Sequence, residues 1–120
     1  MSLFILHSKE HPISNSLEDK LNQALLYVFN EEGITNSSIN LKILNDSDMK
    51  ELNKKFRNKN GTTNVLSFTN DDISKSITRN LGDIAISYDF VKRESEELKK
   101  DFDDHMIHML IHGVYHILGF

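Results

Sequence analysis

The chain contains no cysteine among its 120 residues. This absence excludes a disulfide framework and any thiolate metal site, so a transition metal would depend on histidine and carboxylate ligands. No apolar run approaches about 18 residues, and no basic segment followed by an apolar one stands at the N-terminus. We therefore expect a cytoplasmic protein that does not associate with a membrane.

Proline occurs once and glycine five times, and the intervening segments alternate between strand and helix patterns. Strands are predicted at residues 3–6, 39–43, 64–68 and 81–87. Helices are predicted between Ser16, as the cap, and Gly33, from a cap at Asn45 or Asp46 through 56, over about 88–100, and through the last apolar segment. Residues 69–80 show no core pattern and are predicted to be a polar loop.

This order of elements predicts an α/β (α+β) fold with one domain over residues 1–120. Its small mixed sheet is expected to pack against helices, with the most apolar helix in a central position.

Four of the six histidines fall within twelve residues near the C-terminus: His105, His108, His112 and His116. On a helix, at about 100° per residue, they share one arc of roughly 80°. Apolar residues cover most of the remaining circumference, which is typical of a buried helix whose polar stripe faces the interior or a cleft. A lone buried histidine is usually satisfied within the core. Four on one face favour a metal site, because neutral imidazole is the commonest metal ligand.

Helical zinc sites use histidines four residues apart, and two pairs here have that spacing. His112 pairs with His116, and His108 pairs with His112, so periodicity leaves both possibilities open. Gly113 stands where a zinc peptidase carries its glutamate base, which disfavours peptide hydrolysis. A glycine inside a buried helix also predicts close approach of a strand or a ligand.

The segment HMLIHGVYHILGF resembles the signature helix of the YbeY family, bacterial metal-dependent endoribonucleases of ribosomal RNA maturation. The family pattern is H-G-x-x-H-x-x-G-[YF]-D-H, in which three histidines hold zinc. The segments LNKKFR (52–57) and TNVLSF (63–68) resemble its L-N-x-x-[YF]-R and T-N-V-L-S-F motifs, and LGDI (81–84) fits its L-G-D-I. These matches keep the family order from about residue 50 to the end of the chain.

The resemblance implies one zinc ion per chain in a cleft beside a small mixed sheet, with His112 and His116 as ligands. It implies metal-assisted hydrolysis of single-stranded RNA in 16S ribosomal RNA 3′-end maturation and ribosome quality control, with small-subunit ribosomal proteins as partners. Arg57 matches the motif arginine and is expected to stabilise charge on phosphoryl oxygens. The third ligand of the pattern would fall at position 122, beyond Phe120. We therefore expect this 120-residue form to fold, to hold zinc weakly and to cleave RNA poorly.

Four more residues are expected near the site. Asp83 is a candidate to orient a ligand histidine, and Asn64 and Ser67 are candidates to line the cleft. His108 is expected to hold the helix in register by packing and hydrogen bonding.

The net charge of −4 argues against a protein that coats nucleic acid by charge alone. A local basic run nevertheless contains Lys54, Lys55 and Lys59, which we expect to bind the RNA backbone. Two alternatives to the nuclease remain open from the residues themselves. They are a zinc peptidase and a non-catalytic ribosome-binding factor whose histidines are structural.

Overall fold

The computed structural model describes residues 3–7 and 10–120. The elements in chain order are β1 (Leu3–His7), α1 (Asn15–Glu31), β2 (Ser38–Leu44), α2 (Asp46–Arg57), β3 (Val65–Thr69), α3 (Asp72–Thr78), β4 (Asn80–Ser87), α4 (Tyr88–Glu97) and α5 (Phe102–Ile117). The strands form one sheet in the order β1-β2-β4-β3. Strands β1, β2 and β4 are parallel, and β3 is antiparallel to β4. The predicted small mixed sheet is confirmed.

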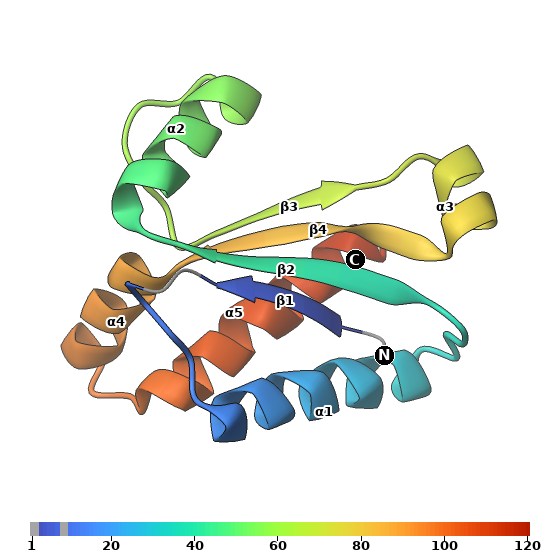
Figure 1. Ribbon diagram of the computed structural model, residues 1–120, viewed down its shortest axis with the longest axis horizontal. Helices are drawn as coiled ribbons and strands as arrows, with labels where there is room; N and C mark the ends of the chain where they lie inside the picture. The colour runs from blue at the N-terminus through green and yellow to red at the C-terminus, as the bar shows by residue number, and fades with distance from the viewer. Residues whose placement is uncertain (1–2, 8–9) are drawn as a thin grey trace.

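The helices cover the two faces of the sheet unequally (Figure 1). Helices α1 and α5 lie side by side on one face, whereas α2 stands over one end of the other. Helix α5 contacts α1, α4, β3 and β4, so the most apolar helix is central, as expected. Its inner side buries Met106, Leu110 and Val114 completely. No helix in the described parts of the chain is both long and apolar enough to cross a membrane.

Gly113 lies where α5 meets the sheet. A Cβ atom there would sit 3.0–3.2 Å from three side-chain carbons of Ile84 on β4. The glycine therefore permits the close helix–strand approach that its position in an apolar helix predicts.

The start of α1 corrects one prediction. The cap is Ser14 and not Ser16: the Ser14 hydroxyl accepts a hydrogen bond from the Leu17 backbone N–H at 3.0 Å. Buried Ile13 directly precedes this cap, which fixes the helix start two residues earlier than the sequence pattern indicates. The predicted end is confirmed, because Gly33 has φ +68° and the Ile34 N–H donates to the Phe29 carbonyl at 2.8 Å.

The segment predicted as a polar loop contains a helix, α3, and that prediction was wrong. Asp71 caps the helix by accepting from the Ser74 N–H at 2.7 Å. No residue of α3 is buried, and Ile73 and Ile77 are 74% and 76% exposed. These two isoleucines stand four residues apart, but neither packs into the core, and a single apolar pair is too short a pattern to predict a helix.

Candidate active site

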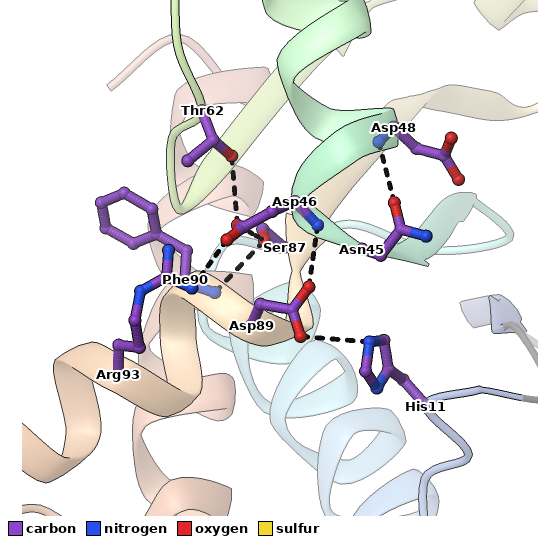
Figure 2. A network of polar contacts seen from close by, with 9 residues as sticks. All are labelled: His11, Asn45, Asp46, Asp48, Thr62, Ser87, Asp89, Phe90 and Arg93. Atoms are coloured by element: carbon purple, nitrogen blue, oxygen red, sulfur yellow. Dashed lines mark hydrogen bonds and ion pairs between the residues drawn. The ribbon is translucent and has the colours of Figure 1, made fainter.

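Helix α2 is fixed at its first residue by Asp46 (Figure 2). One carboxylate oxygen of Asp46 accepts hydrogen bonds from the hydroxyls of Ser87, at 2.8 Å, and Thr62, at 3.3 Å. The other oxygen pairs with the Arg93 guanidinium at 2.6 Å. Burial raises the pKa of Asp46, but these hydrogen bonds and the Arg93 charge outweigh it, so the pKa lies below the ordinary 3.8. The start of α2 is thereby tied to the end of β4 and to α4.

A second carboxylate extends this anchor. The Asp46 backbone N–H donates to Asp89 Oδ2 at 2.9 Å, and Asp89 Oδ1 lies 3.1 Å from His11 Nε2 (Figure 2). The His11 ring stacks on Tyr88 at 4.5 Å between centroids. The segment before α1, the start of α2 and the start of α4 are therefore joined at one end of the sheet.

The opposite end of α2 carries the motif arginine. Asn45 caps the start by accepting from the Asp48 N–H at 2.8 Å, and Asn58 closes the helix in a left-handed conformation with φ +52°. Arg57 is the last helical residue, and its side chain is exposed. Because the first turn is anchored, the helix presents this guanidinium at a defined place.

Arg57 and the histidine pair meet in one cavity of about 310 Å³. Its lining is drawn from α2, β3 and α5: Arg57, Val65, Leu66, Ser67, His112 and His116. Both imidazoles are exposed, one helical turn apart, on the outer side of α5. The structure thus brings together the candidate catalytic residue, the two candidate metal ligands and Ser67, as the sequence predicts.

Ser67 contacts a candidate ligand directly. Its Oγ lies 2.6 Å from Nδ1 of His116. Side chains alternate along β3, so Ser67 points towards α5 whereas Leu66 and Phe68 point towards α2. The hydrogen bond occupies Nδ1 and leaves Nε2 as the ring nitrogen available to a ligand.

The donor set suits zinc in its chemistry. Two imidazoles one turn apart, in a chain without thiolates, are ligands that zinc accepts. Within residues 3–7 and 10–120, no three histidine, aspartate or glutamate side chains gather closely enough to hold a metal ion. His112 and His116 are therefore candidates for two of the three protein ligands that catalytic zinc usually takes.

The other two histidines of the stripe differ from each other. His105 is 3% exposed, and its Nε2 lies 3.1 Å from Glu94 Oε1, while its Nδ1 has no partner. It therefore holds α5 against α4. His108 is exposed, and its recorded ring contact is with His105, at 6.1 Å between centroids. Partial burial, together with the charges of Lys100 and the neighbouring histidines, lowers the pKa of His108. The expected packing and hydrogen-bonding role of His108 stays a prediction: the ring is exposed on α5 and contacts His105 edge-on.

Two residues expected near the histidines lie elsewhere. Asn64 Nδ2 donates to Glu94 Oε1 at 3.1 Å, so Asn64 belongs to the His105 cluster and does not line the cavity. Asp83 accepts from Asn40 Nδ2 at 2.8 Å on the face of the sheet that carries α2. It cannot orient a ligand histidine, because its neighbour Ile84 takes the face towards α5.

Glu94 could not be identified from the sequence pattern. It stands in a run of charged residues, KRESEELKK, and nothing in the sequence distinguishes it from its solvent-exposed neighbours.

Lys54, Lys55 and Lys59 are exposed at and just beyond the end of α2, beside Arg57. Their positions agree with the predicted basic surface.

The fold and the cavity define a small α/β protein with an arginine–histidine cleft at the edge strand of a mixed sheet. The family model described as Endoribonuclease YbeY matches residues 4–120. The chain belongs to this family, which supports an RNA-endonuclease role and so places it among the hydrolases.

Individual relatives agree with this assignment. The endoribonuclease YbeY of Francisella philomiragia is 33% identical over 124 residues, covering 100% of this chain and 77% of that protein. The endoribonuclease YbeY of Francisella tularensis subsp. tularensis is 34% identical over 127 residues, covering 100% of this chain and 73% of that protein. The solution structure of TM1509 from Thermotoga maritima has the same fold, with a TM-score of 0.68 and 24% identity over 98% of this chain and 73% of that one.

Proposed function

We propose that this cavity hydrolyses phosphodiester bonds of single-stranded RNA, with zinc held by His112 and His116. The substrate is ribosomal RNA, cleaved in the cytoplasm during maturation of the 16S 3′ end and in ribosome quality control. Small-subunit ribosomal proteins are the proposed partners. The observation that carries the proposal is the shared cavity: Arg57 of α2 and the histidine pair of α5 line the same space.

Arg57 supplies a permanent positive charge to the phosphate. Charge grows on the non-bridging phosphoryl oxygens during hydrolysis, and a planar guanidinium can donate two hydrogen bonds to them. Arg57 is exposed, so its desolvation is delayed until RNA covers the cavity. Lys54, Lys55 and Lys59 extend the positive surface along the backbone of the bound strand.

Ser67 and the two imidazoles prepare the metal site. A Ser67 hydroxyl that accepts from Nδ1–H of His116 keeps Nε2 unprotonated for the metal. When bound, zinc would act as a Lewis acid on the phosphodiester. The family pattern places a further histidine two positions past Phe120, and we propose that it completes the ligand set. With two ligands from α5 and no third, we expect zinc to be held weakly and RNA to be cleaved slowly.

Metal analysis tests the ligand assignment. Zinc is measured by mass spectrometry after dialysis, in this chain and in one extended with a histidine at position 122. We expect stoichiometric zinc in the extended chain only, and its loss in His112→Ala and His116→Ala. His108→Ala is the matched control, since it removes an exposed imidazole of the same helix outside the cavity. Tight zinc in the 120-residue form, or its loss in His108→Ala, would contradict the assignment.

Incubation with single-stranded RNA and with casein tests the reaction. The extended chain should cut RNA and leave casein intact. Casein cleavage without RNA cleavage would replace the proposal with a zinc peptidase. Zinc binding with neither activity would favour a non-catalytic ribosome-binding factor.

A further inference from the structure

A second cavity lies on the other face of the sheet, beneath α2. Its volume is about 440 Å³, and most of its lining is apolar. Leu52 and Phe56 of α2 and Phe68 of β3 form the walls. Three side chains bring charge to the cavity: Lys42 of β2, Asp48 of α2 and Asp83 of β4. The proposed reaction uses none of these side chains.

The two cavities adjoin across one strand. Phe56, in the second cavity, directly precedes Arg57 in the first, at the end of α2. Ser67 and Phe68 are likewise consecutive on β3, and their side chains lie on opposite faces. Among the described residues, strand β3 is an edge of the sheet, with β4 on one side and no further strand on the other. An RNA strand at Arg57 can therefore continue around this edge.

The Phe56 ring is a preformed stacking surface. It is 57% exposed, and it contacts the Phe68 ring edge-on at 5.3 Å between centroids. The Lys55 ammonium lies 5.4 Å from the same ring. Exposed aromatic rings flanked by cations are the surfaces on which the unpaired bases of single-stranded nucleic acid stack.

The carboxylate of Asp83 favours bases that can donate a hydrogen bond to it. Asp83 carries a carboxylate that only accepts hydrogen bonds, and Asn40 engages its Oδ1. The exocyclic amino groups of cytosine, adenine and guanine can donate to such a carboxylate, whereas uracil has no amino group and can donate only from its ring N3–H.

We infer that the second cavity binds one nucleobase of the RNA strand, close to the phosphate at Arg57. Phe56 provides the stacking surface and Asp83 selects a base that carries an amino group. The inference rests on the proposed function, because it assumes that the strand lies at Arg57.

A double-mutant cycle, which combines a substitution at Phe56 with an abasic nucleotide in the RNA, tests whether a base stacks on Phe56. Binding of a short fluorescent single-stranded RNA is followed by anisotropy, within a time in which a gel shows the strand intact. Phe56→Leu should weaken binding about 5- to 100-fold, as loss of one stacked base does. An abasic nucleotide at one position should cost wild type the same factor and cost Phe56→Leu nothing more. Tyr27→Leu, which removes a 65% exposed ring from α1 on the opposite face, is the matched control and should bind as wild type.

Asp83→Asn tests the choice of base. Wild type should prefer cytosine over uracil at the sensitive position, and the variant should bind both equally. Equal binding by wild type would overturn the role of Asp83.

Three outcomes separate this inference from the proposed function. If the losses from Phe56→Leu and the abasic site add independently at every position, no base stacks on Phe56, and cleavage at Arg57 stands unaffected. Suppose instead that the abasic site costs the Phe56→Leu variant nothing more, but Arg57→Ala cleaves RNA as wild type does. The stacking site then stands and the catalytic assignment of Arg57 fails. If wild type does not bind RNA at all, both are wrong.

Discussion

The two faces of the sheet are built differently. On the face covered by α1 and α5, large side chains such as Leu21, Leu25 and Leu110 are fully buried in one continuous core. On the other face, α2 buries Met49 completely but leaves Leu52 partly exposed and Phe56 mostly exposed. The closed face accounts for most of the apolar burial and therefore for most of the stability. The cavity beneath α2 lies on the open face, and the cavity that Arg57 shares with His112 and His116 lies at the edge strand β3.

Helix α5 belongs both to the buried core and to the cleft. Its inner side belongs to the core, and its outer side carries His112 and His116 into the cleft. The imidazoles can therefore be exposed and still precisely held, because the core fixes the helix that bears them. Arg57 is held differently, through the polar anchor at the far end of α2.

The largest loss of stability is expected from a mutation that removes a buried side chain from the closed face. Leu110→Ala should lower the free energy of unfolding by about 2–5 kcal/mol, since Leu110 is fully buried. Leu52→Ala removes the same atoms from the open face and should cost much less. Urea denaturation measures both. Equal losses would show that the open face is as important for stability as the closed one.

The next largest loss of stability is expected at Gly82, where β4 lies close to the backbone of β3. A Cβ there would collide with the backbone carbonyl oxygen of Phe68 and meet the Ile117 side chain at 3.2 Å. Backbone cannot move aside without breaking the β3–β4 pairing, so Gly82→Ala should cost about 1–3 kcal/mol in thermal unfolding. Gly113→Ala, the control, meets only the side chain of Ile84 and gains helix propensity. It should be close to neutral, and an equally large loss there would mean that Ile84 cannot adjust.

Ser67→Ala should weaken zinc binding without unfolding the protein. Loss of a hydrogen bond to a ligand histidine typically costs about 10- to 100-fold in metal affinity, and Ser67 reaches His116 at 2.6 Å. Zinc competition with a chelating dye, in the chain extended to position 122, measures this change. Ser74→Ala on α3 is a control outside the cavity. Unchanged affinity in Ser67→Ala would show that Ser67 does not position the ligand.

The smallest effect is electrostatic and depends on pH. The pKa of Asp46 is lowered in the fold, so its stabilising contribution is present above the unfolded value of 3.8 and is lost as pH falls through the lower folded value. Arg93→Gln should therefore destabilise the protein at pH 7 by about 1 kcal/mol or less, because the Arg93 side chain is 53% exposed. The difference from wild type should shrink below pH 3.8. Arg79→Gln is the control, because the described residues show no ion pair for Arg79, and its stability should differ little from wild type at either pH. If the stability difference between Arg93→Gln and wild type persists at low pH, it arises from packing and not from the ion pair.

The sequence predicted the closed face better than the open one. Leu17, Leu21 and Leu25 repeat at helical spacing, and Ile39, Leu41 and Ile43 alternate, because burial imposes those periods. Helix α3 buries nothing and left no such pattern. The cleft was predictable because the segments that contain Arg57, His112 and His116 resemble motifs of the YbeY family, and that resemblance implies one shared site. The face on which Asp83 lies was not, since it depends on the register of β4 against β2 and β3.

We propose that residues from α2 and α5 act on one phosphate. The most direct measurement is cleavage of single-stranded RNA by wild type and Arg57→Ala in the chain extended to position 122, at equal zinc content. We predict a rate lowered about 100-fold or more, as for removal of a transition-state donor, with zinc binding and thermal stability unchanged. Arg57→Ala that cleaves at the wild-type rate would contradict the account, because the shared cavity would then have no catalytic meaning.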